Sequence, residues 1–213
     1  FVTPRGESVL VDTGNPGGRD SERILDVLTH AGVEEIDHLL ITHFHGDHHG
    51  GVQELAQRIP IRHFVDHGPS VESNPPAVAF QQAYASLYGA ARHSVVKPGD
   101  RLEIPGLDWL IVSADGAVLT ESVSGAGGST PACPAQRPEA RPDDENGRST
   151  GSLVRFGEFS TIDLGDLLIS QELGLVCPLN RVGTIDLYLT SHHGLATSGS
   201  AALGASAGVD ASW

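Results

Sequence analysis

In the first part of the chain, segments with the apolar pattern of buried strands alternate with segments that have the apolar spacing of a helix. Short segments rich in aliphatic or aromatic residues, typical of buried strands, occupy residues 8–11, 36–41 and 62–65. Between them lie apolar residues at helical spacing, in the segments 24–28 and 52–59. Asp20 and Ser21, both helix-capping residue types, precede the first of these helices, and Gly32 follows it as a stop. The alternation predicts a strand–helix–strand unit and an α/β fold.

The rest of the chain is expected to add one helix, more strands and a long loop. The helix follows Pro75-Pro76 and runs from 77 to about 90, with an aromatic stripe more typical of core than of a substrate platform. Strands with glycine-bearing turns are expected at 93–97, 101–104, 107–113, 151–156, 159–164 and 185–190. Between them, residues 115–148 are rich in Gly, Ser, Pro and charge. A loop of that length is disordered or functional, for example as a lid.

The densest candidate chemistry lies directly after the second apolar run, in the sequence I-T-H-F-H-G-D-H-H-G-G of residues 41–51. Four of the 11 histidines fall between His43 and His49, with Asp47 among them. This segment joins a strand to a helix, the place where open α/β sheets bind their ligands. Imidazole and carboxylate groups together suit zinc, and also manganese or iron. The segment therefore predicts a metal centre rather than a histidine-rich surface loop.

The T-H-F-H-G-D-H-H-G-G sequence resembles the H-x-H-x-D-H signature loop of the metallo-β-lactamase-fold hydrolases. The resemblance implies a four-layer αβ/βα sandwich that binds one or two metal ions, with zinc expected. It assigns His43 and His45 to one metal, and Asp47 and His48 to the other, with Asp47 also orienting the nucleophile. Asp12, in the D-T-G at 12–14, is either a turn residue or a group that orients a ligand histidine.

Further parts of the site follow from the same resemblance. The L-G-D-L sequence at 164–167 resembles the family's strand-ending G-D, which makes Asp166 the metal-bridging carboxylate. The S-H-H-G sequence at 191–194 is similar to that of competence-type DNA-uptake nucleases and phosphorylcholine esterases. By the esterase resemblance, His193 is favoured as the metal ligand and His192 as the catalytic substrate contact, with the reverse order open. Asn146 stands where many members carry a further first-site histidine, so it is a substrate-proximal residue and metal binding is expected to be weaker there.

Two other residues are candidates because a strand is expected to end beside them. Asp66 and His67 follow the expected strand at 62–65 and are either part of the pocket wall, close to the substrate, or a solvated turn. His93 stands alone on its expected strand, and a structural role is more typical of such a histidine.

Composition limits the domain organisation, the compartment and the partners. The 213 residues fit a single domain, 1–213, with an Ala/Gly/Ser-rich end from 196 onward that suggests a truncated C-terminus. A net charge of −14 argues against a nucleic-acid partner, and no apolar run reaches the roughly 18 residues of a membrane span.

The chain starts at Phe1 and has no methionine, as expected of a processed or trimmed chain. Signal-peptide removal, hence secretion or a periplasmic location, is one explanation, and a cytoplasmic location is the other. Cys133 and Cys177 would form a disulfide in an oxidising compartment.

These observations favour a metal-dependent hydrolase that uses metal-activated water on a small-molecule substrate, and the resemblance implies a bacterial branch of the family. A phosphodiester or other ester is the first choice of substrate because of the H-H-G sequence and the missing histidine. A lactone or a β-lactam-type cyclic amide is the second choice. A non-catalytic metal-binding relative is the alternative of another class, and Asp47 argues against it because a purely structural zinc site is closed by four ligands. A nuclease is disfavoured by the acidic balance.

Overall fold

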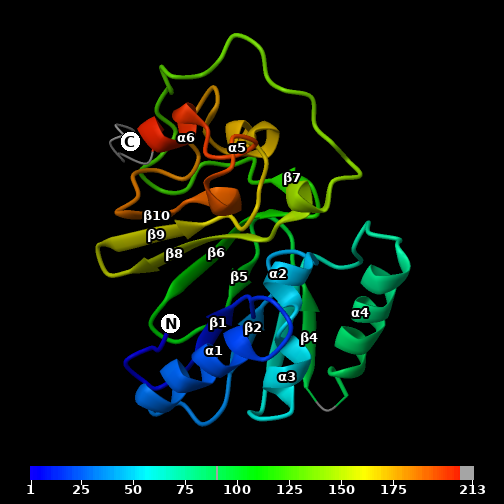
Figure 1. The fold of residues 1–213 in the computed structure, drawn as a ribbon. Helices are drawn as coiled ribbons and strands as arrows, with labels where there is room; N and C mark the ends of the chain where they lie inside the picture. The colour runs from blue at the N-terminus through cyan, green and yellow to red at the C-terminus, as the bar shows by residue number, and fades with distance from the viewer. Residues whose placement is uncertain (90, 207–213) are drawn as a thin grey trace. The chain divides into compact units, whose positions relative to one another are not determined.

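The computed structural model describes residues 1–89 and 91–206, and its fold is drawn in Figure 1. Contacts between Cα atoms divide the chain into two compact units, Phe1–Val96 and Lys97–Trp213. We call them the N-terminal unit and the C-terminal unit. Each unit has its own sheet and its own helices. One β layer and one α layer are what each half of the expected four-layer sandwich requires.

The N-terminal unit contains a four-stranded sheet in the order β1-β2-β3-β4. Its strands are β1 (Val9–Val11), β2 (His38–Leu40), β3 (His63–Asp66) and β4 (Arg92–Val95). All neighbouring pairs are parallel, as the strand–helix alternation predicts. The carboxyl ends of these strands therefore lie along one edge of the sheet.

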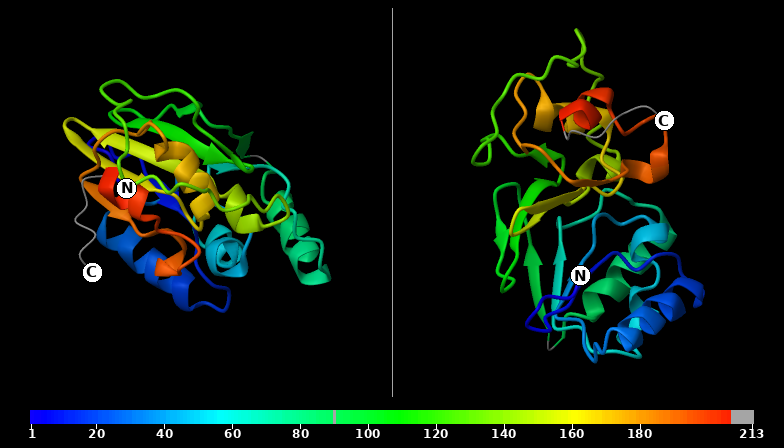
Figure 2. Two further views of the ribbon diagram at one scale, coloured as in Figure 1. Left: turned by 90° about the horizontal axis from the view of Figure 1, so that it is seen from above. Right: turned by 90° about the vertical axis from the view of Figure 1, so that its left-hand side faces the viewer.

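Helices of the N-terminal unit cover one face of this sheet. They are α1 (Arg19–His30), α2 (Gly46–His49), α3 (Val52–Ala56) and α4 (Pro75–Ser86). One apolar cluster holds them to the strands, and its members include Leu39 and Phe64 of the sheet, Val52 of α3 and Tyr84 of α4. Leu25 of α1 packs against the same cluster. The right-hand view of Figure 2 shows these blue and cyan helices on one side of the strands.

The starts of two helices differ in their capping. Helix α1 begins at Arg19 after Gly18, whose φ is 89°, so the expected caps Asp20 and Ser21 lie inside the first turn. The reason is that the positive φ of Gly18 allows the chain to enter the helix earlier. Helix α4 begins at Pro75 and is capped by the side chain of Asn74. It ends at Ser86, and Ala90, where its end was expected, lies outside the described residues.

The C-terminal unit contains a six-stranded sheet in the order β10-β9-β8-β6-β5, with β7 paired to β6. Its strands are β5 (Arg101–Leu102), β6 (Asp108–Ala114), β7 (Ala117–Val118), β8 (Gly151–Phe156), β9 (Phe159–Asp163) and β10 (Leu187–Leu189). The hairpin expected across Gly157 and Glu158 is confirmed as the antiparallel pair β8–β9. β10 runs parallel to β9, so both strands end at the same edge.

Two helices and two 3-10 turns complete the described part of this unit. They are η1 (Glu145–Arg148), α5 (Ile169–Val176), η2 (Ser191–Gly194) and α6 (Ala201–Ser206). Leu173 and Val176 of α5 and Leu203 of α6 join a core cluster with Leu153 and Ile162 of the sheet. The expected loop over 115–148 is largely irregular but carries β7 and η1. Of the Ala/Gly/Ser-rich end, residues 207–213 lie outside the described residues.

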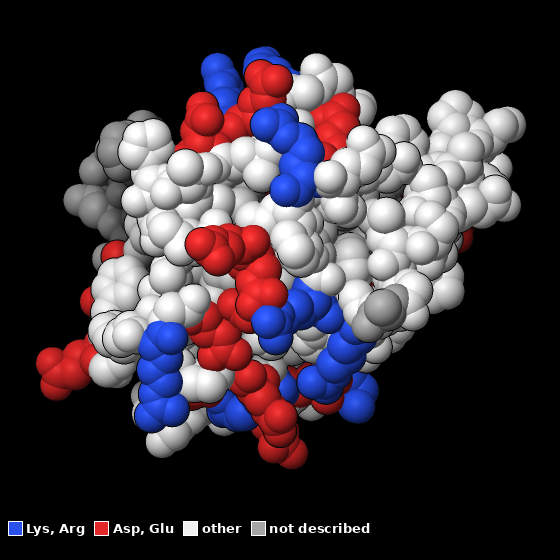
Figure 3. Space-filling model, turned by 90° about the horizontal axis from the view of Figure 1, so that it is seen from below, with Lys and Arg blue, Asp and Glu red and all other residues white. Residues whose placement is uncertain are grey.

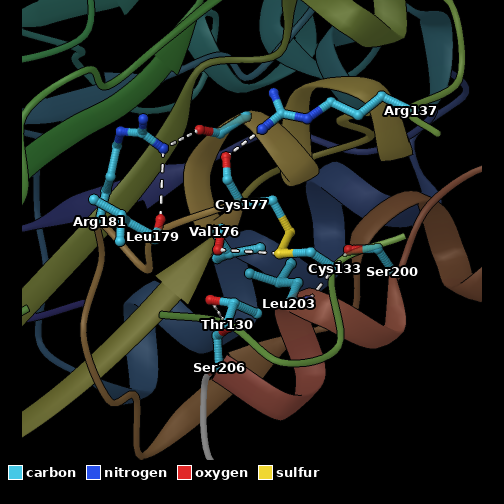
Figure 4. The surroundings of a disulfide bond; sticks show 11 residues. Thr130, Cys133, Arg137, Val176, Cys177, Leu179, Arg181, Ser200, Leu203 and Ser206 are labelled. Carbon is cyan, nitrogen blue, oxygen red and sulfur yellow. Dashed lines mark hydrogen bonds between the residues drawn. A yellow bond between two sulfur atoms is a disulfide. The ribbon is translucent and has the colours of Figure 1, made fainter. Parts of the chain in front are cut away.

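A disulfide joins the long loop to the end of α5 (Figure 4). Cys133 and Cys177 are paired with their Cα atoms 5.7 Å apart, which confirms the expected pairing. Two arginines bind carbonyl groups near this end of the helix. Arg137 donates to the carbonyl of Cys177, and Arg181 Nη1 donates to the carbonyl of Gly174 at 2.7 Å. Cations at a helix C-terminus complement the helix dipole. The disulfide and both arginines therefore all stabilise the C-terminal end of α5.

Surface properties follow the composition. No helix among the described residues is both long and apolar enough to cross a membrane. On the face shown in Figure 3, acidic and basic side chains lie next to each other.

Candidate metal centre

The H-x-H-x-D-H segment lies at the carboxyl edge of the parallel sheet in the N-terminal unit. It follows β2, and the D-T-G segment that follows β1 packs against it through the backbone. Thr13 N donates to the carbonyl of His48 at 2.6 Å, and Gly51 N donates to that of Gly14 at 3.1 Å. A Cβ on Gly51 would lie 2.4 Å from the Thr13 carbonyl oxygen, so this close approach requires glycine. The neighbouring Gly50 also leaves no room for a side chain, because a Cβ there would lie 2.2 Å from the Gly46 carbonyl oxygen.

Asp12 orients this segment. Its carboxylate accepts hydrogen bonds from Thr42 N at 2.8 Å and Thr42 Oγ1 at 2.7 Å. His48 Nδ1 lies 2.7 Å from Asp12 Oδ2. Asp12 has a φ of 57°, a strained conformation for a residue with a side chain, and these contacts hold it there. Of the two interpretations of Asp12, the geometry therefore favours orientation of a ligand histidine over a turn.

The same contacts determine which ring nitrogens face a metal. Because Asp12 holds His48 Nδ1, the ring presents Nε2, which lies 3.9 Å from Asp47 Oδ2. Thr42 donates its hydroxyl hydrogen to Asp12, so its oxygen accepts from His43 Nδ1 at 3.1 Å. This leaves His43 with an Nε2 lone pair, the form in which imidazole binds metals.

His45 completes the pair. Its Nδ1 lies 3.0 Å from Nε2 of His43, and its own Nε2 lies 3.7 Å from Glu72 Oε1. His43 is fully buried, whereas the side chain of His45 is 34% exposed. Two ring nitrogens that converge in this way fit two ligands of one ion. The remaining histidine of the segment, His49, is buried against the rings of Phe44 and Phe80 and belongs to the core.

In the C-terminal unit, Asp166 follows the end of β9 and is buried. Its backbone N–H donates to Ser149 Oγ at 3.1 Å. Asp163, the last residue of β9, accepts instead from Gly165 N at 3.0 Å and shapes the turn. Asp163 thus stabilises the turn itself, and the role of Asp166 as a metal ligand stays a prediction.

His192 and His193 lie beside Asp166 on η2. Their Nε2 atoms are 3.6 Å and 3.5 Å from Asp166 Oδ2. Both residues have left-handed backbones, with φ of 49° and 53°. Their surroundings differ: His193 is 55% exposed, whereas His192 is 14% exposed and its Nδ1 is held by Thr197 Oγ1 at 3.0 Å and Ser198 Oγ at 3.3 Å.

Asn146 is the third residue near this turn. It lies on η1, and its Nδ2 is 3.5 Å from His192 Nε2. Its Oδ1 is buried and has no hydrogen-bond partner among the described residues. A buried amide oxygen without a partner is costly, and a ligand group that donates to it would remove that cost. The substrate-proximal role expected for Asn146 is compatible with this position.

Asp66 and His67 lie at the end of β3 and are both buried, so the solvated-turn interpretation is wrong for them. Asp66 Oδ2 accepts from Tyr84 Oη at 2.9 Å and lies 2.8 Å from His93 Nε2. His93 also stacks on Tyr88, with ring centroids 3.9 Å apart, which confirms a structural role for it. Burial, followed by the charge of Asp66, raises the pKa of both tyrosines. The Asp66 carboxylate thus already has partners inside the unit, and its proximity to substrate stays a prediction.

A family model described as the metallo-beta-lactamase superfamily matches residues 1–135. The chain belongs to this superfamily. A solved metallo-beta-lactamase from Cronobacter sakazakii, a mutant of its HARLDQ motif, has the same fold. It aligns with a TM-score of 0.51 and 15% identity over 98% of this chain and 84% of that one. The α/β fold of the metallo-β-lactamase type is thereby confirmed.

Two curated relatives of this superfamily chain are hydrolases by name. An atrochrysone carboxyl ACP thioesterase from Pseudocercospora fijiensis is 35% identical over 104 residues, which are 46% of this chain and 29% of the relative. A hydroxyacylglutathione hydrolase from Methylobacillus flagellatus is 31% identical over 102 residues, which are 48% of this chain and 31% of the relative. The chain thus spans less than a third of either relative.

Several side chains that position the superfamily site were not found from the sequence. Thr42 and Glu72 contact the ring nitrogens that face away from the expected metal, and Thr197 and Ser198 do the same for His192. Thr42 directly precedes the first histidine, and that adjacency is the one local signal among them. The others are linked to their histidines only through the fold.

Proposed function

We propose that the protein is a metal-dependent hydrolase that cleaves an ester bond in a small molecule, with zinc as its metal. The observation that carries the proposal is the orientation of the histidines in the N-terminal unit. Asp12 and Thr42 hold the Nδ1 atoms of His48 and His43, so each ring presents Nε2. A histidine-rich loop without a ligand would have no need of such fixed tautomers.

The donor set fits zinc and also manganese or iron. In the superfamily pattern, the ligands we propose are His43, His45, Asp47 and His48 from the N-terminal unit and Asp166 and His193 from the C-terminal unit. A metal held by these residues would act as a Lewis acid and would lower the pKa of a coordinated water to about 7. We propose one or two ions, because Asn146 replaces a histidine of the full pattern.

The remaining groups would act on the substrate. Asp47 accepts a hydrogen bond from the attacking water and orients it. His192, fixed at Nδ1 by Thr197 and Ser198, directs Nε2 toward the negative charge that develops on the substrate. Asn146 adds a carbonyl oxygen beside His192 that can accept a hydrogen bond from the substrate.

We propose a phosphodiester or another ester as the substrate class. The names of the relatives support including acyl thioesters among these esters, since one of them is called a thioesterase. A lactone or a cyclic amide is the second candidate class, and the broad superfamily membership supports testing it.

The test combines metal analysis with a substrate panel. Purified protein is stripped with a chelator, reloaded with zinc, manganese or iron, and assayed on a phosphodiester, an oxygen ester, an acyl thioester, a lactone and a β-lactam. We expect bound metal and chelator-sensitive cleavage of an ester. His192→Gln should lose activity, whereas His30→Gln, at the exposed end of α1, should retain it. Folded protein that binds no metal would refute the proposal, and bound metal without any cleavage would support a non-catalytic metal-binding protein instead.

A further inference from the structure

The C-terminal unit contains a buried carboxylate that the proposed hydrolysis does not use. Glu172 lies on α5 and its relative exposure is 0%. Its Oε1 accepts from Gly199 N at 2.8 Å, and its Oε2 accepts from Ser200 N at 2.7 Å. A buried carboxylate is costly unless its oxygens are hydrogen-bonded, so these two bonds firmly join α5 to the segment before α6.

That segment, residues 197–200, also holds His192. Thr197 Oγ1 and Ser198 Oγ lie 3.0 Å and 3.3 Å from His192 Nδ1. The carbonyl of Thr197 accepts from Ile169 N, at the start of α5, at 3.0 Å. Two residues of α5, Ile169 and Glu172, thus fix the short segment that carries both hydroxyl groups.

The backbone of the histidine pair needs such support. Non-glycine residues in the left-handed conformation are strained, and two in succession persist only where the surroundings fix them. On the side that precedes the pair, Tyr188 Oη lies 2.8 Å from Ser191 Oγ, and His192 N donates to the carbonyl of Gly165 at 3.0 Å. On the side that follows it, the contacts run through the 197–200 segment to Glu172.

We propose that Glu172 is a positioning residue for His192. Its carboxylate fixes the 197–200 segment, the segment's hydroxyl groups fix His192 Nδ1, and Nε2 is thereby held toward Asp166 and Asn146. The inference rests on the proposed function in one respect, the role of His192 as the substrate contact. The structural part, that Glu172 controls the state of the His192 ring, does not depend on hydrolysis.

Glu172→Gln tests this with little change in size. The amide offers one oxygen acceptor, and its NH2 group would oppose the second backbone N–H. The segment should therefore loosen at Gly199 or Ser200. Asp186→Asn is the matched control, because Asp186 Oδ2 also accepts from a backbone N–H, that of Ser160 at 2.8 Å, and this bond joins it to β9 rather than to the 197–200 segment.

The first readout is the side-chain 15N spectrum of His192 in metal-free protein with 15N-labelled histidine, assigned by comparison with His192→Gln. In wild type we expect one set of signals. In Glu172→Gln the His192 signals should shift or broaden, because the ring exchanges between tautomers, while Asp186→Asn keeps the wild-type spectrum. On the ester that the wild type cleaves, kcat should fall about 10–100-fold, as for other groups that orient a functional histidine, with KM little changed.

A second variant covers the case in which Glu172→Gln does not fold. The double change Thr197→Val, Ser198→Ala removes the hydroxyl groups while Glu172 stays, and it should reproduce the His192 spectral change. An unchanged His192 spectrum in either folded variant overturns the proposal, as does an equal change in Asp186→Asn. A wild type without esterase activity would refute the proposed function and leave the spectral test intact.

Discussion

His63 gives the N-terminal unit a pH-dependent stability that can be calculated from its surroundings. It lies on β3 and is 7% exposed. Its Nδ1 is 3.0 Å from His38 Nδ1, and its Nε2 is 2.9 Å from Ser94 Oγ. Burial, followed by the charges of Arg92 and His38, lowers its pKa from 6.5 to about 4. The folded protein therefore resists protonation of this ring.

The sign of the effect follows from proton linkage. In the unfolded chain His63 has a pKa of 6.5 and is protonated below that pH. In the folded chain its pKa is about 4, so the ring stays neutral until the pH falls to about 4. Stability is thus lost as the pH falls through this window, and the loss levels off below it. Each pKa unit is worth about 1.4 kcal/mol, so the whole effect is on the order of 3 kcal/mol, of which about 2 kcal/mol is lost by pH 5.

Urea unfolding of wild type and His63→Gln at pH 7 and pH 5 measures this difference. Other groups titrate in both proteins, so the comparison isolates His63. Wild type should lose about 2 kcal/mol more than the variant between the two pH values. His30→Gln, which removes an exposed histidine, is the matched control for the loss of an imidazole. Equal losses in wild type and His63→Gln would mean that the ring is protonated as easily in the folded state as in the unfolded one.

Three further changes test metal binding and the packing of the segment that carries His43, His45 and His48. Asp12→Asn should weaken metal binding about 10–100-fold in a chelator competition, because the histidine it orients loses its fixed tautomer. Gly51→Ala should lower the free energy of unfolding by about 1–3 kcal/mol, since its Cβ would meet the Thr13 carbonyl oxygen, whereas Gly46→Ala enters open space and should cost less. Asn146→His should raise metal affinity by adding the imidazole of the full superfamily pattern, and an unchanged chelator titration would show that this residue is remote from the metal.

Much of the fold could be predicted because its strands are short segments rich in aliphatic or aromatic residues, and turn residues such as glycine separate many of them. The sequence did not indicate which sheet each strand joins. The runs at 93–97, 101–104 and 107–113 look alike, yet β4 extends the parallel sheet whereas β5 and β6 belong to the other one. Sheet membership depends on packing between distant segments, which a local pattern does not contain. The helix start at Arg19 was missed for a local reason, the positive φ of Gly18.

The candidate site, like the fold, has parts that a local sequence pattern predicts and parts that depend on distant segments. The candidate ligands around His43 are visible directly, because several of them stand close together in the sequence. The groups that hold the ligands are not visible, since each comes from elsewhere in the chain. Asp66 has Tyr84 of α4 and His93 of β4 as partners, and Glu172 accepts from Gly199 and Ser200. Composition gave no hint of either network.

The disulfide between Cys133 and Cys177 turns part of the C-terminal unit into a covalent ring. Asn146 and Asp166 lie inside this ring, and residues 134–143, all exposed, form its most accessible stretch. A protease that cuts once within 134–143 would open the ring without separating the two fragments, which stay joined through sulfur. Under a reducing agent the same cut would release the link and leave only non-covalent packing to hold the fragments together. The redox state of the surroundings therefore decides whether a unit cut at this point is still joined covalently.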